Sequence, residues 1–142
     1  MTMLYKSKFD TIPGTSHACV MRLARYEYHQ MQKQTPRRQP YIRSRYFRRD
    51  KVFVNQFWDH VKQKRPGDQL RRVKLYVCAI DLIRNTTASP ETIFSRDNMN
   101  MSLHRFYGQT KSGKLFCVQI KQDKRTGRKD FMSVFPSKAL PK

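Results

Sequence analysis

The sequence has few of the residues on which several protein classes depend. Its three cysteines, Cys19, Cys78 and Cys117, are an odd number and lie far apart, which argues against a disulfide framework and a structural zinc site. No apolar run approaches the ~20 residues that a membrane-spanning helix needs. The first twenty residues also lack the apolar stretch of a secretory signal. We therefore expect a protein of a reducing, cytoplasmic compartment with no membrane partner.

Glycine and acidic residues are scarce as well. Only 5 glycines occur, and they form no glycine-rich phosphate-binding loop. The 10 Asp and Glu residues include no closely spaced pair that would suit a two-metal nuclease or a glycosidase. We expect neither a metal ion nor an organic cofactor.

Basic residues are abundant instead. The 142 residues include 30 Lys and Arg, which leaves a formal net charge of +20, and the excess is spread along the whole chain. Such a protein repels itself, and binding to a polyanion relieves the repulsion by releasing counterions. The charge therefore predicts RNA or DNA as the partner, with an acidic protein as the alternative.

Residues 1–45 are predicted to be a basic, partly helical accessory arm, and residues 46–142 a single domain. An apolar stripe at helical spacing predicts a helix over residues 16–34. Residues 37–49 then interleave arginine with aromatic side chains, which suits phosphate neutralisation and base stacking. A basic linker whose aromatics dock on the domain explains the pattern equally well. The RNA contacts expected in this segment are Arg43, Arg45, Tyr46, Arg48 and Arg49.

Two helices are predicted next, over residues 50–64 and 68–85, with Arg72 and Arg84 on the polar side of the second. Arg84 is a further expected RNA contact. The pattern then changes to strands over 103–109, 114–122 and 129–135, separated by turns. Three strands at this spacing predict an antiparallel meander. The expected fold class is α+β, with N-terminal helices packed on a small antiparallel sheet.

Strand alternation predicts which side chains leave the helix-covered face of this sheet. On the opposite side, which we call the outer face, we expect Arg105, Tyr107, Gln119, Lys121, Lys129, Phe131, Ser133 and Phe135. Cations, hydroxyls and aromatics sharing one face suit single-stranded RNA. An ordinary solvated sheet face is the alternative.

RNA cleavage without a metal needs a base for the 2′-hydroxyl, an acid for the leaving oxygen and cations for the phosphorane. His104 is the best acid–base candidate, although its alternation places it on the core side, where a hydrogen-bonded strand-end histidine is the simpler interpretation. Lys121 could act as a base only with a lowered pKa. Arg105, Tyr107 and Ser133 could bind or donate to phosphate oxygens.

Residues 46–136 resemble the phage and mobile-element branch of the barnase–EndoU–colicin–RelE-like nuclease superfamily. The resemblance rests on LIRN, Ser89-Pro90, HRFYG, TKSGKLFCVQIK and MSVFP in this order, after YFRRDKVFVNQFWDHVKQK and RRVKLYVCAIDLIRN. It implies a barnase/RelE-like domain, with a fourth strand near residues 92–96. It also implies a toxin-like, metal-independent endoribonuclease with functional groups at His104, Arg105, Tyr107, Lys121 and Ser133.

A toxin of this kind would suit an acidic antitoxin or immunity-type partner. Two alternatives remain open at this point. One is a non-catalytic RNA- or DNA-binding module of the same fold. The other is a structural or interaction protein of a mobile element.

Overall fold

The computed structural model describes residues 4–35, 37, 39–95, 97 and 99–140. Its elements follow in the order β1 (Leu4–Lys6), α1 (His17–Gln34), β2 (Tyr41–Ser44), β3 (Asp50–Phe53), α2 (Asn55–Lys62), α3 (Pro66–Val73), α4 (Tyr76–Asn85), β4 (Glu91–Phe94), β5 (Met101–Gln109), β6 (Leu115–Asp123) and β7 (Lys129–Pro136). No helix in these described ranges is long and apolar enough to cross a membrane.

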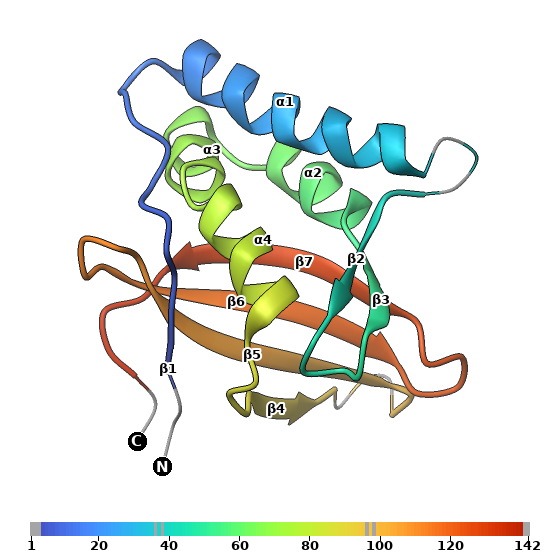
Figure 1. Cartoon of the computed structure of the whole chain (residues 1–142). Helices are drawn as coiled ribbons and strands as arrows, with labels where there is room; N and C mark the ends of the chain where they lie inside the picture. The colour runs from blue at the N-terminus through green and yellow to red at the C-terminus, as the bar shows by residue number, and fades with distance from the viewer. Residues whose placement is uncertain (1–3, 36, 38, 96, 98, 141–142) are drawn as a thin grey trace.

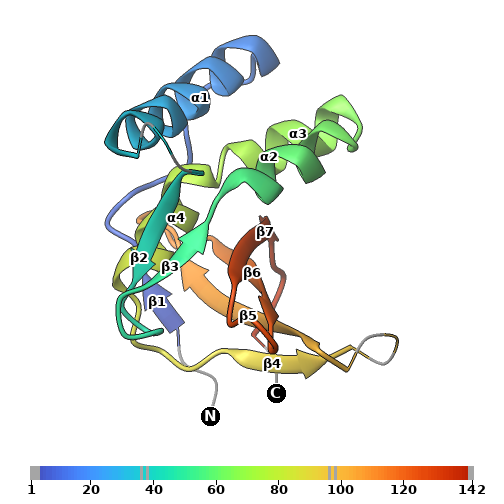
Figure 2. The same ribbon diagram turned by 90° about the vertical axis from the view of Figure 1, so that its right-hand side faces the viewer.

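All seven strands join one mixed, curled sheet. Its order is β1-β5-β6-β7-β3-β2, and β4 pairs with the part of β5 that β1 leaves free. The β5–β6–β7 meander is antiparallel, whereas the pairings of β1 with β5 and of β3 with β7 are parallel. Helices α2, α3 and α4 cover one face of the sheet, and α1 lies across them as a further layer (Figure 1). Seen from the side, the sheet curls around this core (Figure 2).

The predicted architecture of N-terminal helices on a small antiparallel sheet is wrong in its details. The meander and an additional strand, β4, are present, but β1, β2 and β3 extend them into a seven-stranded mixed sheet. The helix predicted over 50–64 begins only at Asn55, because residues 50–53 form β3. Val52 and Phe53 fit a helical stripe, yet their backbone pairs with β2 and β7. Of these partners, β7 is remote in sequence and leaves no local signal.

Residues 1–45, predicted to be an accessory arm, contribute β1, α1 and β2 to the same core. Val20, Ala24, Met31 and Ile42 are all buried in the central cluster. The helix predicted over 16–34 is confirmed, and Ser16 caps it by accepting a hydrogen bond from the Cys19 N–H at 3.4 Å. The N-terminal third is therefore built into the domain that carries the candidate sites.

The single helix predicted over 68–85 is instead two helices, α3 and α4. They are separated by Lys74 and Leu75, and Leu75 is buried in the core. Asp68 lies in the first turn of α3, where it pairs with Arg71 and Arg72. The break lets α4 leave the direction of α3 and carry its C-terminal residues toward β2 (Figure 1).

A β-bulge in β7 reverses part of the predicted face assignment. Gln119 pairs with Ser133 but Ile120 pairs with Phe131, so Met132 is an extra residue in β7. Phe131 is consequently fully buried and stacks on Phe57, with ring centroids 4.8 Å apart. Our placement of Phe131 and Lys129 on the outer face is therefore wrong, since both lie on the helix-covered side.

Candidate nucleic-acid interface

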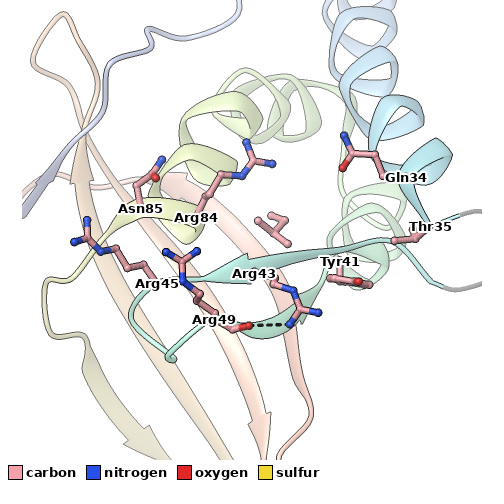
Figure 3. A pocket seen from close by; sticks show the side chains of 9 residues that line it. Gln34, Thr35, Tyr41, Arg43, Arg45, Arg49, Arg84 and Asn85 are labelled. Atoms are coloured by element: carbon pink, nitrogen blue, oxygen red, sulfur yellow. Dashed lines mark hydrogen bonds between the residues drawn. The ribbon is translucent and has the colours of Figure 1, made fainter.

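A pocket of about 630 Å³ lies where the β2–β3 hairpin meets the C-terminal ends of α1 and α4. Four arginines line it, and three of them come from the hairpin while the fourth comes from α4. The guanidinium groups of Arg45 and Arg49 lie between the hairpin and α4, which carries Arg84 (Figure 3). We call this site the arginine pocket; its lining residues are Gln34, Thr35, Tyr41, Ile42, Arg43, Arg45, Arg49, Arg84 and Asn85.

The turn of the hairpin positions two of these arginines. Ser44 and Asp50 are the last paired residues, and the Arg49 N–H closes the loop on the Ser44 carbonyl at 2.7 Å. Arg48 and Arg49 both adopt left-handed backbone conformations, with φ of 55° and 66°. A side chain in this region costs ~1–2 kcal/mol, so the surrounding structure must hold the loop in place.

Two aromatic side chains fix the loop by packing against the sheet. Tyr46 packs edge-on against Phe106 at 5.3 Å between ring centroids, and Phe47 packs edge-on against His104 at 5.2 Å. Docking of the aromatics on the domain, one of the two predicted roles, is thus observed for these residues. The loop therefore half-buries its aromatic rings and leaves its arginines exposed.

The arginine pocket is strongly electropositive because no carboxylate lines it. Among the described residues, each acidic side chain that forms an ion pair does so with a cation that does not line the pocket. Asp50, at the end of the hairpin, pairs with Lys129 at 2.6 Å, and its pKa is lowered mainly by that hydrogen bond. Arg43 donates to the Arg49 carbonyl at 3.0 Å, and its charge makes a smaller contribution to the lowered pKa of Asp50. An anion is the natural occupant of such a site.

The strand register builds a second polar surface on the outer face. Arg105 stands opposite Gln119, which stands opposite Ser133, so these three form one row across β5, β6 and β7. Tyr107, Cys117 and Phe135 form the next row in the same way. Lys121 lies in the row on the other side, between Leu103 and Asp130. Of the predicted RNA contacts, Gln119 lies on this face, and Arg43, Arg45, Arg49 and Arg84 line the arginine pocket. The others, Tyr46, Arg48, Lys129 and Phe131, belong to neither surface.

Sequence reasoning missed two charged residues next to the outer face. Arg72, which it left on the solvent side of a helix, donates to the Ser133 hydroxyl at 2.6 Å and lies over the Phe135 ring. Glu91 of β4 stands opposite Arg105, and their charged groups are 3.8 Å apart. Both contacts join segments distant in sequence. Two polar residues that line the arginine pocket, Gln34 and Asn85, were also not identified from the sequence. Their positions at the predicted ends of two helices are the local signal that could have indicated them.

His104 lies on the other side of the sheet from Arg105. Its Nδ1 is 2.9 Å from the Thr92 hydroxyl and its Nε2 is 2.7 Å from the Gln122 amide oxygen. Burial lowers the pKa of the imidazole, and the Lys129 charge lowers it further, whereas the hydrogen bond that the ring donates to Gln122 raises it. The imidazole is therefore neutral at pH 7, and the predicted hydrogen-bonded strand-end histidine is the arrangement observed.

The outer face holds two groups that keep their protons at neutral pH. Burial raises the pKa of Tyr107 to about 12, with smaller contributions from Cys117 and Glu91. Burial likewise raises the pKa of the Cys117 thiol to about 11, so this cysteine is a poor nucleophile. Glu91 can accept a proton, Tyr107 can donate one, and Arg105 can stabilise negative charge.

No protein-family model, curated protein or solved structure matches this chain. In the part of the chain that the structure describes, no three His, Cys, Asp or Glu side chains are grouped as metal ligands. The geometry and charge of the two surfaces are therefore the basis for interpreting function.

Proposed function

We propose that this protein binds RNA and that the arginine pocket holds backbone phosphates. The observation that carries the proposal is the convergence of Arg43, Arg45, Arg49 and Arg84 on one pocket without a carboxylate in its lining. A guanidinium group can donate two parallel hydrogen bonds to the oxygens of one phosphate, because its planar set of N–H groups matches the spacing of those oxygens. The net charge of +20 adds long-range attraction for a polyanion.

The proposal agrees with the resemblance of residues 46–136 to a superfamily of RNA-cleaving enzymes. It does not depend on catalysis, because the arginine pocket lies apart from the outer face. An acidic neutralising protein would compete for the same arginines. RNA is favoured over an acidic protein because the pocket is concave and has the volume of a small-molecule site, which suits a phosphate and its sugar.

The test measures binding to a fluorescent single-stranded RNA across a salt series. Arg45→Gln with Arg84→Gln should weaken binding and reduce the slope of log affinity against log salt by about 1.4, since each phosphate contact on a single strand contributes ~0.7. The matched control is Arg71→Gln with Arg125→Gln, which removes the same charge at side chains that are 67% and 71% exposed. Equal losses in both double variants would refute a role for the pocket.

A second candidate function is metal-independent RNA cleavage on the outer face. The observation that favours it is the placement of Glu91 opposite Arg105, in the row next to Tyr107. Glu91 would take the 2′-hydroxyl proton, Tyr107 would protonate the leaving 5′-oxygen, and Arg105 would stabilise the phosphorane. Arg72, hydrogen-bonded to Ser133, would supply a further cation.

Cleavage is tested with end-labelled transfer RNA and messenger RNA in EDTA. Glu91→Gln, Arg105→Ala, Lys121→Ala and Ser133→Ala should each reduce cleavage, whereas Arg125→Ala should not. Intact RNA with the wild-type protein, beside an active control nuclease, would leave RNA binding as the function. Cleavage that is unchanged in all four variants would show that the reaction takes place elsewhere.

A further inference from the structure

A second cavity, between α1 and α4, adjoins the arginine pocket. This cavity has a volume of about 350 Å³, and Gln34, Arg84 and Asn85 line both spaces. Both volumes lie in the ~300–1,000 Å³ range of small-molecule sites. We call the second cavity the α1–α4 cavity.

The α1–α4 cavity differs from the arginine pocket in its chemistry. Its walls include the apolar side chains Phe9, Met31, Val77 and Ile80, together with the ring of Tyr76. Phe9 comes from the segment before α1 and is 41% exposed. The Lys8 ammonium group lies over its ring, 5.4 Å from the centroid. A flat apolar group can therefore contact the part of this ring that remains exposed in the cavity.

Polar side chains of α1 complete the wall of the cavity. Gln30 and Gln34 present amide groups, and no described residue forms a hydrogen bond with either of them. Glu27 is exposed, and its carboxylate has no cation within 4.0 Å among the described residues. Lys8 and Asp81 also line this cavity, and the Asp81 carboxylate accepts hydrogen bonds from Ser7, the Lys8 N–H and Asn85. Charges of both signs therefore line the α1–α4 cavity, whereas the charged residues of the arginine pocket are all arginines.

A simple polyanion does not fit both ends, because Glu27 would repel it. A nucleotide does, because it carries a phosphate on one side and a flat ring with N–H donors on the other. We propose that the combined space binds one unpaired nucleotide of RNA, with its phosphate on Arg84 and its base beside Phe9. This inference rests on the proposed function and adds to it a requirement for an unstacked base.

The experiment compares three ligands of equal length: a single-stranded RNA, the same strand with abasic nucleotides, and an RNA duplex. Stacking of a base on an aromatic side chain contributes ~1–3 kcal/mol, which converts to at least about a fivefold preference for the base-containing single strand over the abasic strand. Phe9→Ala should abolish the preference. Phe94→Ala is the matched control, because Phe94 is 61% exposed and, like Phe9, lies beneath a lysine ammonium group.

A second variant keeps the test decisive if Phe9→Ala unfolds the protein. Glu27→Gln removes a negative charge and, on electrostatics alone, strengthens the binding of every RNA. We expect it to reduce the preference for the base-containing strand while leaving abasic binding equal or stronger. Strands with a 5′-phosphate, a 3′-phosphate or neither then show whether a terminal or an internal nucleotide enters.

The outcomes separate this inference from the proposed function. If base-containing and abasic strands bind equally while the Arg45→Gln, Arg84→Gln variant weakens both, the nucleotide site is refuted and phosphate binding stands. If the wild-type protein shows no salt-dependent binding to any of the three ligands, both proposals fail.

Discussion

At the scale of the residue, His104 shows how burial sets the charge of a titratable group. Its two ring nitrogens face Thr92 and Gln122, and the ring lies against Phe47. A protonated imidazole would be desolvated there and would face the ammonium group of Lys129. The site therefore favours the neutral ring, which accepts one hydrogen bond and donates another.

A pH dependence follows from this lowered pKa. Because the folded-state pKa of His104 lies below the ordinary value of 6.5, protons bind the unfolded chain more tightly. His104 therefore does not change the free energy of unfolding above about pH 6.5. As the pH falls from there toward the folded-state pKa, the free energy of unfolding decreases. Imidazole titration by nuclear magnetic resonance should give a midpoint below 6.5 for His104. A midpoint at or above 6.5 would contradict the observed packing.

At the scale of the element, the bulge in β7 decides which aromatic side chain is in the core. The extra residue Met132 turns Phe131 toward Phe57 and leaves Phe135 on the outer face beside Arg72. Without the bulge, strict alternation would place both phenylalanines on one side.

Two substitutions of the same kind test this assignment. Phe131→Ala should lower the free energy of unfolding by ~3–5 kcal/mol, the usual loss for a buried aromatic side chain. Phe135→Ala should cost less than half as much, because that ring is only half-buried. Urea unfolding of both variants measures the difference, and equal losses would be inconsistent with the bulge.

The β2–β3 hairpin is a second element, and the energetic cost of its left-handed turn residues can be measured. Arg48 has a φ of 55° and does not line the arginine pocket. Arg48→Gly should raise the free energy of unfolding by about 0.5–1 kcal/mol, because the relief of left-handed strain exceeds the added flexibility of the unfolded chain. Arg48→Val, with a β-branched side chain, should lower it. Urea unfolding midpoints of the two variants should therefore move in opposite directions.

At the scale of the whole molecule, the net charge of +20 opposes the compact state. Raising sodium chloride from low to moderate concentration should raise the melting temperature, and ~1 kcal/mol of relieved repulsion corresponds to roughly 3–5 °C for a domain of this size. Inorganic phosphate at equal ionic strength should raise it further by binding the arginine pocket.

The double variant Arg45→Gln, Arg84→Gln separates the two effects. It should retain most of the response to sodium chloride and lose the additional response to phosphate. Thermal unfolding followed by circular dichroism provides the measurement. A melting temperature that falls with salt would show that attractive ion pairs outweigh the repulsion.

Local pattern was sufficient for the features that depend on neighbouring residues. The apolar stripe and the Ser16 cap specify α1, and alternation between turns specifies the meander of β5, β6 and β7. The same alternation placed Arg105, Gln119 and Ser133 on one face, where the register aligns them. The arginines of the pocket were also recognised as RNA-contacting candidates, although not as a pocket.

The sequence by itself determined the composition, the charge and those local periodicities. Tertiary structure alone decided that residues 50–53 pair as β3, that Met132 forms a bulge, and that Arg84 meets the hairpin arginines. The pairing of β3 with β7 and the meeting of Arg84 with the hairpin join segments distant in the chain, whereas the bulge depends on the register between the neighbouring strands β6 and β7. Local periodicity indicates only which face of a segment is buried. The strand with which that segment pairs is decided by the hydrogen bonds and apolar contacts of the assembled core.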